Sequence, residues 1–474
     1  MGFKKLFIHQ KWVDTKKYLE VKSPYDGSLA GIVCSADKEL TEQAIKAAFE
    51  ARKKMSLLTA KERGDILDKT AMLIKENSEN FAKTITAESG KGIAFSRGEA
   101  LRTAENFHFA ADEARRLSGE LIPFDAAASG ANRFGYYKRY PIGVVGAITP
   151  FNFPLNLVGH KVGPAIAAGC PIVLKPASST PLTSVLLVET LLEAGLPEYA
   201  INLVVGSGSV VGNTMVESDL INMLTFTGSP SVGLEIKSKA GIKKVTLELG
   251  SNSPAIINED ADISNAIPRC VVGGFSNSGQ VCISIQRIYV HENRYNEFKE
   301  MFVGAVNASK FGNPADEKVL VGPMINKSEA ERAEDMIKRA VAQGAKILVG
   351  GKRNGTMLEP TILENVDETM DVVSEEVFAP IVNLMKFKTL EEAIERANNS
   401  QFGLQAGIFT KDIKSAFYTI ENIETGGVMI NDVPTFRVDQ MPYGGVKLSG
   451  TGREGPKFAV EEMTELKTVM FNLN

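Results

Sequence analysis

Residues 143–250 carry the pattern that most restricts how this chain can fold. Five short runs of apolar and β-branched residues alternate there with four segments of helical periodicity. The runs span residues 144–148, 172–174, 201–205, 221–226 and 244–247, and the helical segments span 155–168, 183–194, 210–217 and 231–240. Strands that alternate with helices at this spacing form a parallel sheet with helices on its faces. Ligands of such sheets bind at the carboxyl ends of the strands.

Similar patterns continue on both sides of this region. Before it, residues 41–54, 61–89 and 100–117 predict amphipathic helices, and residues 134–140 predict an exposed ribbon strand. After it, a second pattern predicts strands at 254–257, 287–290 and 346–349 and helices near 293–308 and 327–343. The predicted fold class is therefore α/β, with two lobes and a small ribbon.

Length, net charge and hydropathy limit the number of domains and the kinds of partner that this chain can have. The chain has 474 residues, enough for about two to four domains. Its net charge of −4 argues against nucleic acid or an anionic membrane as a partner. No run of about 18 apolar residues occurs, so we expect no membrane span and a cytoplasmic protein.

The cysteines and histidines do not form a metal-binding pattern. None of the four cysteines belongs to a CxxC motif, and the four histidines are scattered, so we predict neither a metal site nor disulfides. Cys34, Cys170 and Cys270 lie among small or apolar neighbours, as buried cysteines do.

Cys282 has different surroundings. It lies in the polar segment 277–284, and a thiolate there could act as a nucleophile. Glu248 stands between two leucines before Gly250 and is a candidate carboxylate base. Together they suggest chemistry through a thioester.

Two glycine-rich segments indicate dinucleotide binding. Residues 206–212, with Gly208, and residues 228–233, with Gly228 and Ser229, each follow a predicted strand and open a helix. Glycine allows close backbone approach, and helix N-terminal amides favour phosphate. Neither segment fits GxGxxG, because Val211 occupies the third glycine position of the first. Lys175 follows another strand and is interpreted as a ribose- or phosphate-binding cation.

Seven motifs occur in an order and spacing that resembles the aldehyde dehydrogenase superfamily over nearly the whole chain. They are 150–154 (PFNFP), 175–176 (KP), 226–229 (FTGS), 247–250 (LELG), 279–282 (GQVC), 375–380 (EEVFAP) and 442–450 (PYGGVKLSG). Within the superfamily the chain looks similar to lactaldehyde, succinate-semialdehyde and sulfolactaldehyde dehydrogenases. The resemblance implies a cofactor-binding domain of residues 1–121 and 142–250, a catalytic domain of 251–441 and an oligomerisation ribbon of 122–141 and 455–474. It also implies a homodimer or homotetramer.

The resemblance implies a role for each motif residue. Cys282 would attack the aldehyde, Asn152 would hold the oxyanion, and Glu248 would activate the water that hydrolyses the thioester. The presence of Glu248 implies a free acid product, because acylating relatives lack this carboxylate. Lys161 and Glu465 resemble a proton-relay pair, although an ordinary salt bridge fits equally well. The cofactor, NADP or NAD, would be held by Thr149, Pro150, Lys175, Ser178, Gly208, Thr227, Gly228, Ser229, Leu249, Glu376 and Phe378.

Ser178 bears on the choice of cofactor. NAD-preferring relatives often have a glutamate there, which repels a 2′-phosphate. A serine removes that repulsion, so NADP use is favoured and NAD remains acceptable.

Three basic residues bear on the substrate. The resemblance places His108, His160 and Arg437 along the substrate tunnel, where they would suit a small anionic or hydroxylated aldehyde of the lactaldehyde or sulfolactaldehyde type. Succinate-semialdehyde enzymes have an arginine in place of His160. A succinate-semialdehyde enzyme or one of broad or aromatic specificity remains the alternative.

Overall fold

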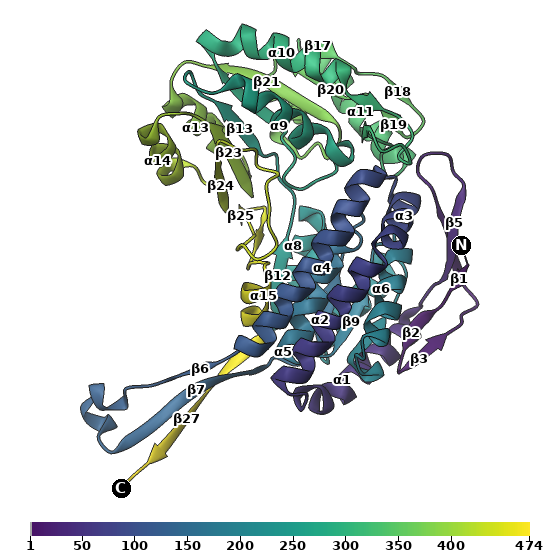
Figure 1. Cartoon of the computed structure of the whole chain (residues 1–474), viewed down its shortest axis with the longest axis vertical. Coiled ribbons are helices and arrows are strands. Elements are labelled where there is room, and N and C mark those ends of the chain that lie inside the picture. The colour runs from purple at the N-terminus through teal and green to yellow at the C-terminus, as the bar shows by residue number, and fades with distance from the viewer. Residues whose placement is uncertain (1) are drawn as a thin grey trace.

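The computed structural model describes residues 2–474 and contains two large sheets and a projecting ribbon (Figure 1). The first sheet has eight strands in the order β26-β12-β11-β8-β9-β10-β2-β3, and its five central strands are parallel. The predicted parallel sheet is thus confirmed. The central strands are β8 (Val145–Ile148), β9 (Ile172–Lys175), β10 (Ile201–Leu203), β11 (Met223–Thr227) and β12 (Lys244–Glu248). The antiparallel edge strands are β2 (Leu6–Ile8), β3 (Lys11–Val13) and β26 (Gly450–Thr451).

Helices cover both faces of this sheet, and one apolar core includes strands and helices alike. They are α1 (Lys38–Ser56), α2 (Ala60–Glu76), α3 (Ser78–Ser89), α4 (Ile93–Arg116), α5 (Asn156–Ala168), α6 (Leu182–Glu193), α7 (Asn213–Glu217) and α8 (Pro230–Lys239). The single helix expected over 61–89 was wrong, because the chain breaks at Asn77 (φ −99°, ψ 17°) and forms two helices. Residues Gly208–Gly212 form a short π-helical turn before α7.

The second sheet has the order β17-β20-β21-β14-β13-β23-β24 and is parallel except at its β17 edge. Its strands are β13 (Pro254–Ile257), β14 (Arg287–His291), β17 (Lys346–Val349), β20 (Thr361–Glu364), β21 (Ile381–Phe387), β23 (Gln405–Phe409) and β24 (Gly427–Ile430). The helices of this lobe are α9 (Ile263–Phe275), α10 (Tyr295–Ala308), α11 (Lys327–Ala342), α12 (Asp371–Ser374), α13 (Leu390–Asn398) and α14 (Ile413–Asn422). Two further apolar clusters form its core.

Short strands complete the body of the molecule. They are β1 (Phe3–Lys4), β4 (Tyr18–Lys22), β5 (Leu29–Cys34), β15 (Lys310–Phe311), β16 (Val319–Val321), β18 (Arg353–Asn354), β19 (Met357–Leu358), β22 (Phe402–Gly403) and β25 (Val446–Lys447). After β24 the chain returns to the first lobe, where β26 pairs with β12 and α15 (Pro456–Glu462) packs on α4 and α5. This return brings residues 437–454 over the end of β12.

The ribbon consists of β6 (Gly119–Leu121), β7 (Arg133–Pro141) and β27 (Thr464–Asn472) and extends away from both lobes (Figure 1). β27 pairs with β7 in antiparallel register from Thr464 opposite Pro141 to Asn472 opposite Arg133. Within residues 2–474, no helix combines the length and apolarity needed to cross a membrane.

Candidate active site

A cavity of about 410 Å³ lies where β8 and β11 of the first sheet end and the second lobe approaches them. The chain leaves β8 towards β9 and later adds β11 on the other side of β8, which is the arrangement that leaves a crevice for ligands. The lining includes the predicted residues Pro150, Asn152, Thr227, Gly228, Ser229, Leu249, Cys282, Glu376 and Phe378.

A turn of left-handed backbone brings Cys282 to this cavity. Asn277, Ser278 and Gly279 follow α9 with φ values of 50°, 57° and 67°. A Cβ on Gly279 would lie 2.1 Å from the carbonyl oxygen of Ala379, so the close approach requires glycine. Gly279 is therefore required for the backbone conformation of the loop that carries Cys282.

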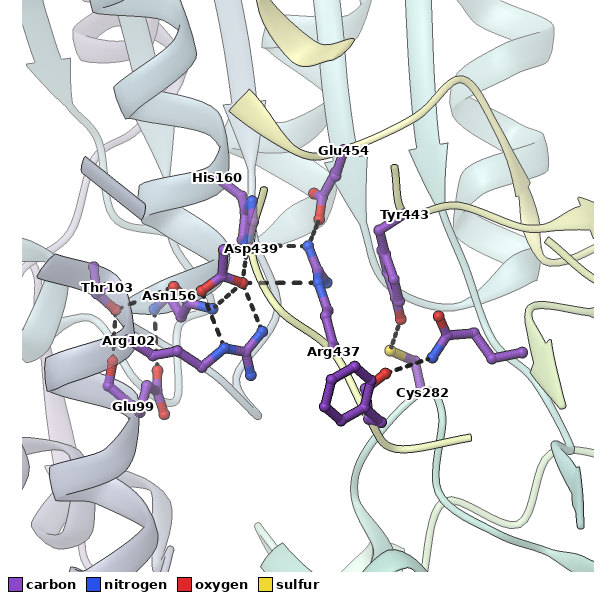
Figure 2. Close-up of polar contacts among 12 residues, drawn as sticks. Glu99, Arg102, Thr103, Asn156, His160, Cys282, Arg437, Asp439, Tyr443 and Glu454 are labelled. Atoms are coloured by element: carbon purple, nitrogen blue, oxygen red, sulfur yellow. Dashed lines mark hydrogen bonds and ion pairs between the residues drawn. The ribbon is translucent and has the colours of Figure 1, made fainter. Parts of the chain in front are cut away.

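The half-buried thiol of Cys282 contacts a tyrosine. Its Sγ lies 2.9 Å from the hydroxyl of Tyr443 (Figure 2). Burial raises the pKa of Cys282 to about 11, while the hydrogen bond from Tyr443 and the charge of Arg437 oppose that rise. Because the thiolate is the nucleophilic form of cysteine, groups that stabilise it increase the reactivity of this sulfur.

Asn152 is held beside the Cys282 loop. Its Nδ2 donates to the carbonyl of Gln280 at 3.0 Å, and Nδ2 of Asn277 donates to the backbone carbonyl of Asn152 at 3.3 Å. The backbone N–H of Cys282 donates to no acceptor within the described residues. Two donors, the Asn152 amide and this N–H, thus belong to residues that line the same cavity.

Glu248 ends β12 as a buried carboxyl. Neither of its oxygens has a hydrogen-bond partner in residues 2–474. Burial, and next Glu454, raise its pKa well above the ordinary value, while Arg437 and Lys161 act in the opposite direction. Gly444 (φ +159°) makes room for it, because a Cβ there would lie 2.8 Å from Oε1 of Glu248.

The expected pairing of Lys161 with Glu465 is wrong. Nζ of Lys161 lies 2.8 Å from Oε1 of Glu454 and also donates to Oγ1 of Thr227 at 2.8 Å. Glu465 is exposed on β27, opposite Tyr140, because the chain has already turned into the ribbon there. Glu454 has a pKa of about 2, since Lys161 and its other cationic neighbours outweigh the effect of burial.

A buried network joins Arg437 and His160 (Figure 2). Nη2 of Arg437 lies 3.1 Å from Glu454 Oε2 and 3.0 Å from His160 Nε2. His160 Nε2 lies 2.8 Å from Oδ1 of Asp439, which Arg102 also binds through two nitrogens. Burial lowers the pKa of His160, as does Arg437, so this imidazole is neutral near pH 7. Burial alone would raise the pKa of Asp439, but His160 and both arginines bring it below its ordinary value.

His108 does not join this network, contrary to expectation. Its side chain is 62% exposed, and its Nδ1 lies 2.7 Å from Asp68 of α2. Both His108 and Arg102 belong to α4, but they are six residues apart and so point in directions about 120° apart around the helix axis. His108 therefore contacts a neighbouring helix at the surface.

The side chains around the cavity fit a dinucleotide. Glu376 accepts a hydrogen bond from the Ser251 N–H at 2.9 Å, and burial raises its pKa to about 7. Lys175 is 6% exposed and has a pKa lowered to about 8 by burial. Within residues 2–474 it donates only to the Pro176 carbonyl, at 3.3 Å. A buried ammonium with two unused hydrogens suits ribose hydroxyls.

The remaining predicted cofactor-binding residues lie on several different loops. Phe378 has a left-handed φ of 47° and contacts Phe151 edge to face. Oγ1 of Thr149 is buried and lacks a partner in the described part of the chain. Ser178 donates to the Gly206 carbonyl at 2.7 Å, which ties two loops together, and Gly208 has open space where a Cβ would stand. Thr149, Lys175, Ser178 and Gly208 lie outside the lining of the cavity.

Comparison with known proteins agrees with this geometry. The aldehyde dehydrogenase family model matches residues 12–469. The chain belongs to the aldehyde dehydrogenase family. The predicted resemblance and the assignment as an NAD(P)-dependent aldehyde dehydrogenase are confirmed.

Three members of the aldehyde dehydrogenase family illustrate the similarity. A 3-sulfolactaldehyde dehydrogenase from Priestia megaterium is 45% identical over 468 residues, covering 99% of this chain and 98% of the relative. Aldehyde dehydrogenase 21 from Physcomitrella patens, solved with the reaction product succinate, has a TM-score of 0.97, 44% identity and coverage of 100% and 98%. A glyceraldehyde-3-phosphate dehydrogenase from Methanocaldococcus jannaschii, complexed with NADP, has a TM-score of 0.93, 40% identity and coverage of 97% and 100%.

Four residues of this aldehyde dehydrogenase site were missed by the sequence analysis. They are Arg102, Asp439, Tyr443 and Glu454. Tyr443 lies inside one of the seven motifs, and Glu454 follows it closely, so position in the sequence could have drawn attention to both. Arg102 and Asp439 gave no such signal, because their pairing depends on the return of the chain to α4.

Proposed function

We propose that this enzyme oxidises a small anionic or hydroxylated aldehyde, of the lactaldehyde or sulfolactaldehyde type, to its carboxylic acid with NADP or NAD. The observation that carries the substrate class is Arg437, whose side chain is 6% exposed. Its guanidinium carbon lies 3.6 Å from the ring centre of Tyr443, the tyrosine that contacts the Cys282 thiol. Its Nη1 forms no hydrogen bond within the described chain, and its buried Nε forms none there either, although it lies 3.8 Å from Oδ1 of Asp439. These nitrogens can bind a sulfonate, phosphate or carboxylate.

The charges around Arg437 support a substrate with one negative group. Arg102, Lys161 and Arg437 supply three positive charges, and Asp439 and Glu454 supply two negative ones. With His160 neutral, the network retains one unbalanced positive charge. An anionic aldehyde compensates that charge when it is bound away from water.

We propose the following roles for the catalytic residues. The Cys282 sulfur adds to the aldehyde carbon, and the carbonyl electron pair moves to the oxygen. The Asn152 amide and the Cys282 N–H donate to that oxygen, and one such donor is worth roughly 3–4 kcal/mol. Glu248 accepts a proton from water, whose oxygen attacks the thioester; the carbon–sulfur bond then breaks and releases the acid.

The cofactor would lie along the cavity. Once bound, NADP or NAD would supply the acceptor for the hydride that the aldehyde carbon loses. We propose that Glu376 and Lys175 hold ribose hydroxyls and that Phe378 supports the nicotinamide ring, with Thr149, Pro150, Thr227, Gly228, Ser229 and Leu249 forming the walls. Ser178 and Gly208 would lie at the adenosine end, and the lack of a carboxylate at 178 leaves NADP acceptable.

Domain organisation and assembly are also proposals. The two sheets suit a cofactor-binding domain of 1–121 and 142–250 and a catalytic domain of 251–441. The ribbon, with residues 122–141 and 455–474, has exposed apolar side chains such as Phe134, Leu466 and Phe471, which suit a homodimer or homotetramer. The absence of disulfides among the four cysteines supports a cytoplasmic location.

Succinate semialdehyde is the second candidate substrate. It is favoured by the structural similarity to an enzyme solved with succinate and by the second arginine, Arg102, beside Arg437. Its carboxylate carbon and the sulfonate sulfur of sulfolactaldehyde both stand three bonds from the aldehyde carbon, so the two substrates differ in the 2-hydroxyl and in the anionic group.

An aldehyde panel tests this proposal. Initial rates of NAD(P)H formation would be compared for sulfolactaldehyde, lactaldehyde, glyceraldehyde-3-phosphate, succinate semialdehyde and benzaldehyde, each with both cofactors. We expect the highest kcat/KM for a three-carbon aldehyde that bears an anionic or hydroxyl group, and a fall of at least about ten-fold for the anionic ones in Arg437→Met. Preference for benzaldehyde, or an Arg437→Met variant that treats all five alike, would contradict the substrate class.

A further inference from the structure

The hydroxyl of Tyr443 has one hydrogen-bond partner within the described residues, the Cys282 sulfur at 2.9 Å (Figure 2). The tyrosine is 2% exposed, so no bulk water replaces that partner. Buried polar groups in proteins are normally hydrogen-bonded, and the sulfur is the partner of this one. We propose that Tyr443 is a catalytic residue whose hydroxyl donates a hydrogen bond to the Cys282 sulfur and stabilises the attacking thiolate. This inference rests on the proposed role of Cys282 as nucleophile.

The tyrosine ring is fixed from several sides. Its backbone N–H donates to the Glu454 carbonyl at 3.0 Å, and the Glu454 N–H donates back at 2.7 Å. The Arg437 guanidinium covers one face of the ring. Ile283 and Leu404 form an apolar cluster with it. The distance between hydroxyl and sulfur is therefore set by the fold before any substrate binds.

The direction of the hydrogen bond follows from the chemistry. A thiolate has no proton, so Tyr443 must donate when Cys282 is ionised. Burial, and next Cys282 itself, raise the pKa of Tyr443 well above the ordinary value, so the phenol keeps its proton throughout the neutral range. The S–H bond of Cys282 breaks and its proton passes to water, while the phenol O–H stays intact at every step.

Other charged groups near the sulfur have opposite effects on the ionisation of the Cys282 thiol. Arg437 favours the thiolate, and the carboxyls of Glu248 and Glu376 disfavour it. Burial is the largest influence and also disfavours the thiolate. Tyr443 is thus the one neutral donor, among residues 2–474, that acts directly on the sulfur atom.

The Tyr443→Phe variant tests this role because it removes the hydroxyl and keeps the ring and its stacking on Arg437. The measurement is the rate of Cys282 alkylation by iodoacetamide in the full-length enzyme, from about pH 6 to about pH 10, without cofactor or aldehyde. Cys34, Cys170 and Cys270 are completely buried, so labelling reports on Cys282, and Cys282→Ala gives the background. We expect the variant to react at least about ten-fold more slowly near pH 7 and its profile to move to higher pH, with a similar loss in kcat/KM.

Two controls keep the test decisive. Tyr289→Phe removes another buried hydroxyl, one that donates to the Arg396 carbonyl in the second lobe, and should leave alkylation unchanged. Incorporation of 3,5-difluorotyrosine at position 443 retains the hydroxyl as a stronger donor, and alkylation should then be faster than in the unmodified enzyme. A Tyr443→Phe profile identical to that of the unmodified enzyme, with Cys282→Ala inactive, would overturn this inference alone. Turnover by Cys282→Ala would instead overturn the proposed function.

Discussion

At the scale of residues, the site combines two acidic groups whose ionisation is opposed by burial. Burial raises the pKa of Cys282 to about 11 and that of Glu248 well above its ordinary value. Both must be deprotonated to act, one as nucleophile and one as base. Arg437 and Lys161 act against burial at Glu248, and Arg437 and Tyr443 do so at Cys282. Ionisation in this site thus depends on a few buried contacts.

The first prediction concerns pH. Water activation needs the carboxylate form of Glu248, which is present above its pKa, so kcat should increase as pH rises through that raised value. In Glu248→Gln, no group at this position titrates, and the residual kcat should lose that dependence. The measurement is kcat against pH for both proteins. An unmodified enzyme whose kcat falls from about pH 6 to about pH 8 would contradict the role of Glu248.

The second prediction concerns Ser178. A carboxylate at this position would repel the 2′-phosphate of NADP, so Ser178→Glu should lower the ratio of kcat/KM for NADP to that for NAD by at least about ten-fold. Ser178→Ala loses the hydrogen bond to Gly206 but adds no charge, and should change the ratio much less. If Ser178→Glu leaves the ratio unchanged, this loop does not face the adenosine 2′ position.

At the scale of elements, periodicity and turn residues predicted the parallel strands of the first sheet closely. In the second sheet, β13 and β17 begin and end at the expected residues. The break between α2 and α3 was missed, because Asn77 interrupts the backbone without interrupting the apolar periodicity. Short edge strands such as β26 and the contacts of residues 437–454 were also missed. β26 pairs with β12 about 200 residues away, and Tyr443 contacts Cys282 across 161 residues, separations that local patterns do not encode.

The loop that carries Cys282 gives the third prediction. Gly279→Ala places a Cβ 2.1 Å from the Ala379 carbonyl oxygen and forces a side chain into left-handed backbone, which alone costs roughly 1–2 kcal/mol. We expect activity to fall strongly and thermal stability to decrease. Gly304→Ala is the matched control: it lies within α10, where a Cβ meets nothing within 4 Å, and it should retain activity. Normal turnover by Gly279→Ala would show that the loop does not need this backbone.

At the scale of the whole molecule, the chain crosses between its lobes twice, and both crossings contribute to the site. The first places Glu248 at the end of β12 and leads into β13. The second carries Arg437, Tyr443 and Glu454 back to the first lobe. The site therefore depends on the relative position of the two sheets. The ribbon strand that follows α15 extends away from both lobes (Figure 1) and contributes no residue to this network (Figure 2).

The ribbon gives the fourth prediction. Leu466→Asp places a charge on β27, where the leucine is 54% exposed in the single chain, and should shift the enzyme towards monomers in size-exclusion chromatography with light scattering. Ile242→Asp changes a fully exposed isoleucine in a loop outside the ribbon and should leave the mass unchanged. A Leu466→Asp protein with the same mass as the unmodified one would argue against assembly through this ribbon.

The covalent thioester at Cys282 is the central claim, and intact-protein mass spectrometry of Glu248→Gln tests it most directly. This variant should accept the aldehyde but release the acid slowly, so mixing it with NADP and sulfolactaldehyde should trap an adduct. We predict an added mass equal to the aldehyde minus two hydrogens, located on the Cys282 peptide and absent when the cofactor is omitted. An unmodified protein after turnover, or an adduct on another cysteine, would contradict the account.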